Sequence, residues 1–112
     1  MNGSRGEQLW IGMVELRSAD PSNQILKDSK GAFVNLVTWA AATNDYRHKA
    51  ELIAQDLGLF VVGIENEEPV ATRRQKTGGI FEEEIEDMIS RAETNPNAII
   101  YGTFHTFDRD DA

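Results

Sequence analysis

The chain has 112 residues and no cysteine, and its 19 acidic and 11 basic residues give a formal net charge of −8. This length suits a single domain over residues 1–112, with tails at 1–7 and 108–112 expected to be disordered, and the lack of cysteine excludes disulfides, thiolate metal sites and thiol catalysis. Residues 65–112 hold twelve of the acids and only five of the bases, a balance that repels nucleic-acid phosphates and anionic lipid. We therefore expect neither nucleic acid nor membrane as a partner, and we expect a cytoplasmic location because the first eight residues lack the apolar core of a secretory signal.

Residues 8–16 and 32–40 are predicted to form the first two strands. In the first, apolar side chains occupy both alternating sets of positions, which is typical of a strand with little solvent on either face. The second is rich in the β-branched and aromatic residues that favour strands. The connection over 18–31 is too long for a tight hairpin, and its apolar pair Ile25 and Leu26 is available to cover part of the sheet.

Two amphipathic helices are predicted, over 44–57 and 80–94. Apolar residues recur in both at spacings of three and four, so that each helix has one apolar stripe. The stripes consist of Tyr46, Ala50, Ile53 and Leu57 in the first helix and of Phe81, Ile85, Met88, Ile89 and Ala92 in the second. The continuous apolar run over 59–64 predicts a third strand between the helices, and 97–107 is predicted as the last strand.

Together these elements predict an α+β fold in the order β-β-α-β-α-β, with one four-stranded mixed sheet. A helix that joins two strands of a sheet normally crosses over right-handed and makes them parallel, so both helices are expected on one face of the sheet. By alternation, the other face carries large side chains from the second and fourth strands. They are Phe33, Val37, Trp39, Tyr101 and Phe107. A slip of one residue would exchange the two faces.

The glycine pair Gly78-Gly79 lies just before the second helix and just after three bases, an arrangement that holds phosphate in some proteins. The bases are Arg73, Arg74 and Lys76. Acidic residues already occupy the first turn of the helix, however, and the chain contains no nucleotide-binding glycine motif. We therefore interpret the pair as part of a surface loop.

Five acids gather on the second helix, namely Glu82, Glu83, Glu84, Glu86 and Asp87. This pattern indicates a solvated face or a docking surface for a basic protein partner. A metal is not expected, because carboxylates four residues apart supply too few ligands and no histidine completes a helical di-metal motif. No cofactor is expected either.

One face of the predicted sheet collects the candidate ligand-binding residues Asn35, Trp39, Tyr101, Thr103 and His105. Histidine titrates near neutral pH, so His105 could carry a proton beside Tyr101 or Asn35 in a cavity on this face. His48 lies among charged residues of the first helix and is expected at the surface. No serine or threonine stands in a recognisable catalytic frame, so no catalytic residue is predicted.

Two hypotheses for the function remain open. The first is a small, acidic, non-catalytic interaction domain that forms a homodimer through the aromatic sheet face and docks a basic protein, as an antitoxin or immunity-type inhibitor would. The alternative is a small-molecule binding protein or enzyme with a sheet-face cavity around His105. A structure discriminates between them, because the first needs a filled, dry interface and the second a closed pocket at His105.

Overall fold

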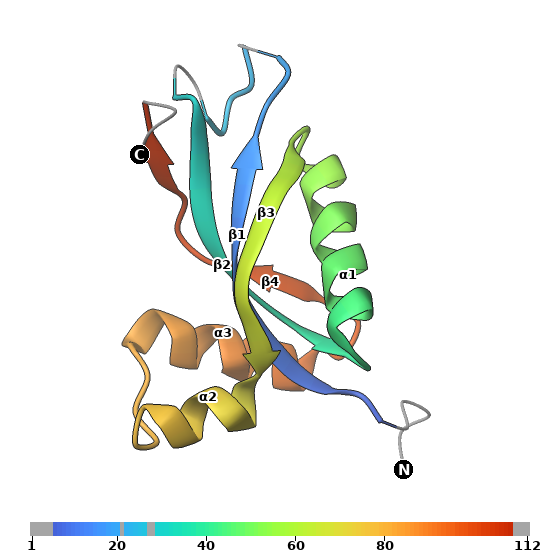
Figure 1. The fold of residues 1–112 in the computed structure, drawn as a ribbon, viewed down its shortest axis with the longest axis vertical. Helices are drawn as coiled ribbons and strands as arrows, with labels where there is room; N and C mark the ends of the chain where they lie inside the picture. The colour runs from blue at the N-terminus through green and yellow to red at the C-terminus, as the bar shows by residue number, and fades with distance from the viewer. Residues whose placement is uncertain (1–5, 21, 27–28, 109–112) are drawn as a thin grey trace.

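The computed structural model describes residues 6–20, 22–26 and 29–108 (Figure 1). Most of the two predicted tails, at 1–5 and 109–112, lies outside the described residues. In the described part of the chain the fold is α+β, with five strands and three helices. These are β1 (Gln8–Arg17), β2 (Gly31–Ala40), α1 (Thr43–Asp56), β3 (Phe60–Pro69), α2 (Val70–Lys76), α3 (Glu83–Thr94), β4 (Ile99–Tyr101) and β5 (His105–Phe107). None of the helices in this part of the chain is long and apolar enough to cross a membrane.

Every pair of neighbouring strands in the sheet is antiparallel, so the prediction of a mixed, four-stranded sheet is wrong. The strand order is β3-β1-β2-β4, and β5 also pairs with β2. Strand β1 lies between β2 and β3, which therefore run in the same direction without touching. The crossover through α1 still joins two strands of one direction, as predicted, but β1 is inserted between them.

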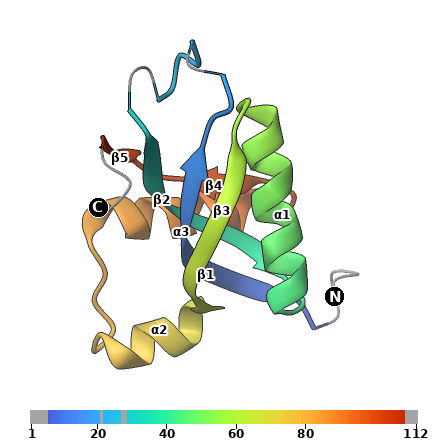
Figure 2. The ribbon, with the colours of Figure 1, turned by 45° about the horizontal axis from the view of Figure 1, so that its top comes forward.

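The helices lie on opposite faces of the sheet, which corrects the prediction that both cover one face. Helix α1 packs its buried stripe on the face that carries Val14 of β1 and Leu36 of β2. Helices α2 and α3 pack on the other face, over Ile11 and Val37, which are fully buried. Figures 1 and 2 show α1 alongside β3, with α2 and α3 together near one end of the sheet. The reason lies in β1, whose two apolar faces both need cover.

The sequence predicted no element between the strand over 59–64 and the helix over 80–94, but β3 continues as far as Pro69 and the chain then forms α2. Acidic residues are tolerated there because β3 is at the edge of the sheet, where charged side chains are common. A register shift against β1 between Glu65 and Glu68, together with a positive φ of 59° at Asn66, bends this part of the strand. Helix α2 has only seven residues, too few to show a helical period.

The last predicted strand, 97–107, is broken into β4 and β5 by residues 102–104. The break is held by Glu84 of α3, whose carboxylate accepts hydrogen bonds from the backbone N–H (3.0 Å) and the hydroxyl of Thr103. Because of it, Tyr101 lies opposite Leu36 on the α1 face, whereas His105 lies opposite Phe33 on the other face. The prediction that Tyr101 and His105 share a face is therefore wrong.

Candidate binding groove

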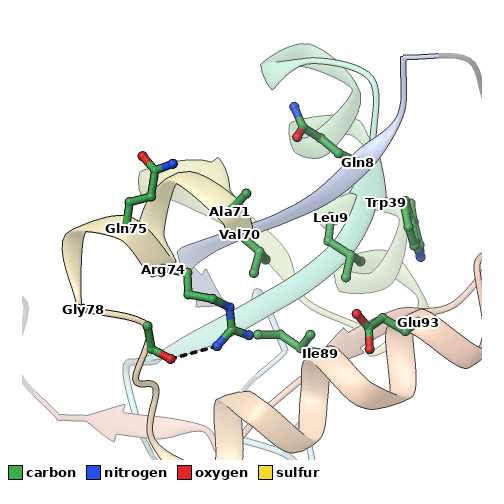
Figure 3. Close-up of a pocket in the computed structure, with 11 residues that line it drawn as sticks. Gln8, Leu9, Trp39, Val70, Ala71, Arg74, Gln75, Gly78, Ile89 and Glu93 are labelled. Carbon is green, nitrogen blue, oxygen red and sulfur yellow. Dashed lines mark hydrogen bonds between the residues drawn. The ribbon is translucent and has the colours of Figure 1, made fainter.

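A hollow of about 580 Å³ lies between α2 and α3, over the beginning of β1 and the end of β2 (Figure 3). Five of the described residues that line it are apolar, and they come from four different elements. These are Leu9, Trp39, Val70, Ala71 and Ile89. Polar groups stand at the edge, from Gln8, Arg74, Gln75 and Glu93, and the loop residues Gly78 and Gly79 complete the lining. A volume of this size, mostly apolar with a few polar groups, is typical of ligand sites.

The floor of this groove is built by a cross-strand pair. Leu9 of β1 and Trp39 of β2 stand opposite each other in the register of the two strands. The indole Nε1–H of Trp39 donates a hydrogen bond of 2.9 Å to the backbone carbonyl of Ala92 in α3. This bond fixes the ring against α3, so Trp39 is a rigid part of the groove wall.

One end of the groove is closed by Arg74. Its guanidinium donates to both carboxylate oxygens of Glu86 in α3, at 2.9 and 3.1 Å, and to the carbonyl of Gly79, at 3.1 Å (Figure 3 shows the bond to the loop). It also lies 4.6 Å from the centre of the Phe81 ring. Hydrogen bonding from Arg74 lowers the pKa of the Glu86 carboxyl, and the same bond raises the pKa of Arg74. The charge of Arg74 is therefore balanced within the protein.

The other end of the groove carries an uncompensated acid. Glu93 follows Ile89 by one turn of α3 and, like it, lines the groove. Among the described residues, none forms a hydrogen bond or an ion pair with the Glu93 carboxylate. Its negative charge contributes, after the bond to Glu86, to the raised pKa of Arg74. The wall formed by α3 thus has a neutralised end at Glu86 and a negative end at Glu93.

The five ligand-binding residues proposed from the sequence are not brought together. Only Trp39 lines the groove. Asn35 borders a separate, polar hollow of about 300 Å³, and Tyr101 and Thr103 border another of about 230 Å³ on the far side of α3. His105 is exposed in β5, opposite Phe33. The break between β4 and β5 puts Tyr101 and His105 on different faces, and no local pattern in the sequence revealed it.

The acids of α3 have different partners. Glu84 binds Thr103, Glu86 binds Arg74, and Asp87 forms an ion pair of 2.9 Å with Arg91. No group of three or more histidine, aspartate or glutamate side chains in the described part of the chain is placed to hold a metal ion. Gly78 and Gly79 have φ values of 71° and 87° and form the turn between α2 and α3, where glycine tolerates a left-handed backbone.

The aromatic face that motivated the homodimer is largely covered by the chain itself. Val37 is fully buried beneath α3, Trp39 is bonded to α3, and Tyr101 lies on the α1 face. Phe33 and Phe107 remain on the uncovered part of the sheet, with ring centres 5.3 Å apart. The oligomeric state stays a prediction, without most of the anchors on which it was based.

The sequence matches no known family model, and no curated protein or solved structure matches it. Sequence reasoning missed Leu9, Ile89 and Glu93 as groove residues. The signal for Ile89 was its place in the apolar stripe of the second helix, which indicated burial but not a partner. Since α2 was not predicted, the groove between α2 and α3 could not be predicted either.

Proposed function

We propose that the chain is a non-catalytic interaction domain that binds a basic, amphipathic segment of a partner protein in the groove between α2 and α3. The observation that supports this most is an open hollow of about 580 Å³ with an apolar floor and, in its α3 wall, the carboxylate of Glu93, which is unpaired among the described residues. Amphipathic segments dock in such grooves by placing apolar side chains on the floor.

The negative charge of the chain determines which kind of partner segment can bind in the groove. The chain has a net charge of −8, and Glu82 and Glu83, at the start of the α3 region, are exposed. Among the described residues, Arg74 is the base that lines the groove, and it is balanced by Glu86. A segment that carries lysine or arginine on its polar side is therefore attracted and held in one orientation, whereas an acidic segment is repelled.

A second candidate function is the binding of a small molecule in the same groove. Its volume of about 580 Å³ lies in the range of small-molecule sites, and the rigid Trp39 ring offers a flat apolar contact. This site replaces the cavity expected around His105. The two candidates differ in length of ligand and in charge, and one titration series separates them.

The test uses two synthetic helical peptides of identical leucine pattern, with leucine at spacings of three and four, one carrying lysine and the other glutamate at the polar positions. Binding to the isotope-labelled protein is followed by amide NMR shifts. We expect the lysine peptide to shift resonances of Leu9, Ala71 and Ile89, and the glutamate peptide to leave them in place.

A pair of variants locates the site. Ala71→Trp fills the groove from the exposed side of α2, whereas Leu52→Trp places the same side chain on the exposed side of α1, over the other sheet face. We expect the first variant to weaken binding of the lysine peptide about tenfold or more and the second to leave it unchanged. Equal affinity in the two variants, or shifts that map away from the groove, would contradict the proposal.

A further inference from the structure

We infer that the Trp39 end of the groove is a subsite for an organic cation, such as the lysine or arginine side chain of a bound segment. This inference rests on the proposed function, because it assigns the charge of the group that enters the same groove. Three observations support it. The indole ring of Trp39 is fixed, the carboxylate of Glu93 beside it forms no hydrogen bond or ion pair with a described residue, and the charge of Arg74 at the far end is neutralised by Glu86.

The indole ring of Trp39 is held in place on two sides. Its Nε1–H is bonded to the Ala92 carbonyl at 2.9 Å, and Leu9 stands opposite it on β1. Figure 3 shows the ring nearly edge-on at the side of the groove, and Trp39 lines the hollow together with Leu9. The face of an aromatic ring is the negative side of its quadrupole, and tryptophan is the best of the aromatic residues at attracting a cation.

Glu93 supplies a full negative charge at the same end. In Figure 3 its carboxylate lies between Ile89 and Trp39, beside the hollow that these residues line. No hydrogen bond or ion pair with another described residue ties up this carboxylate. A cation that enters therefore meets a ring face and a carboxylate together, and it does not have to displace an internal partner.

The bases near the groove do not occupy this subsite. Arg74 points to the opposite end, where Glu86 and the Gly79 carbonyl bind it, and an incoming anion there would compete with Glu86. Lys49 donates to the backbone carbonyl of Trp39, but it belongs to α1 and therefore reaches this carbonyl from the other face of the sheet. The Trp39 end is thus left open and negative.

The experiment compares three small probes of nearly equal shape and different charge, namely choline, 3,3-dimethylbutan-1-ol and 3,3-dimethylbutanoate. The readout is the NMR resonance of the Trp39 indole N–H, and the indole N–H of Trp10, on the α1 face, is the internal control. We expect choline to shift the Trp39 resonance saturably in about the millimolar range, the alcohol more weakly, and the anion not at all.

Glu93→Gln removes the charge and keeps the shape, and we expect it to weaken choline binding about fivefold. Glu51→Gln removes an equal charge from an exposed position of α1 that does not line the groove, and we expect choline binding to stay the same within about twofold. Thermal unfolding of both variants verifies that the fold is retained.

Equal binding of choline and the alcohol, preference for the anion, or the same effect of the two glutamine variants would overturn the cation subsite. If the lysine peptide still occupies the groove in that case, the proposed function stands and only the subsite is lost. If the lysine peptide also leaves the groove resonances in place, the proposed function fails as well.

Discussion

Gly12, in the middle of β1, is the position where one added methyl group should do the most damage. A Cβ there would lie 2.9 Å from the Tyr46 hydroxyl oxygen, 3.0 Å from Glu67 Cβ and 3.1 Å from Glu67 Cα. The Tyr46 hydroxyl occupies this space in order to donate a hydrogen bond of 2.7 Å to the carbonyl of Leu36. Burial, and then the charge of Glu67, raise the pKa of the Tyr46 hydroxyl, which therefore remains a donor.

Gly12→Ala should lower the free energy of unfolding by about 2–3 kcal/mol. Overpacking a core costs about 1–3 kcal/mol, and loss of the Tyr46 hydrogen bond adds about 1 kcal/mol if the ring moves away. At about 4 °C per kcal/mol for a domain of this size, the melting temperature should fall by roughly 10 °C. Urea unfolding, with the midpoint and the slope both fitted, measures the change in the free energy of unfolding. It does not require the unfolded states of the variant and the wild type to be equally compact.

Gly63→Ala is the matched control, because a Cβ on Gly63 of β3 meets nothing within 4 Å. This variant should be neutral or stabilising by up to about 0.5–1 kcal/mol, since alanine restricts the unfolded chain. Adding Tyr46→Phe to Gly12→Ala should recover only part of the loss, because the contact with Glu67 remains. The packing argument fails if the two alanine variants are equally stable.

Two further predictions concern the acids that hold elements together. Glu84→Ala should speed amide hydrogen exchange at Thr103 about tenfold, because the N–H at the break between β4 and β5 loses its acceptor. An unchanged exchange rate would show that Glu84 is not needed to keep this loop in place. Hydrogen bonds from Lys76, then Arg73, lower the pKa of Glu68, so its stabilising effect is present above its ordinary pKa of 4.5 and is lost as the pH falls below it. The difference in urea midpoint between wild type and Glu68→Gln should therefore shrink below pH 4.5, and a difference independent of pH would contradict this account.

The elements that depend on local pattern were predictable, and those that depend on distant partners were not. The predicted helices 44–57 and 80–94 correspond to α1 and α3, since each shows an apolar stripe over several turns. The α+β class is confirmed as well, because the apolar patterns that distinguish helices from strands are local. Strand order was not predictable, because the insertion of β1 between β2 and β3 depends on pairing between residues about fifty positions apart.

The candidate site was harder to predict than the fold, for a related reason. The residues proposed from the sequence were grouped by strict alternation through 97–107, and a single contact from Glu84 breaks that alternation at Thr103. This contact joins residues 19 positions apart and leaves no periodic trace in the sequence. Trp39 is the one of the five proposed residues that lines the groove, and its role in binding stays a prediction.

The acidic excess of the second half of the chain has two separate uses in this structure. Several acids are bound within the protein, namely Glu67, Glu68, Glu84, Glu86 and Asp87. The carboxylates of Glu82, Glu83 and Glu93 have no such bond with any described residue. The bonds of Glu68 and Glu86 tie α2 to β3 and to α3, and in the proposed function the remaining acids would attract the partner. Exposed charges at the rim mainly speed encounter and are screened by salt, whereas a charge inside the groove acts after contact and slows departure. Glu93 is the one of these three that lines the groove, so in the proposed function it is the acid that would act on a bound segment after contact.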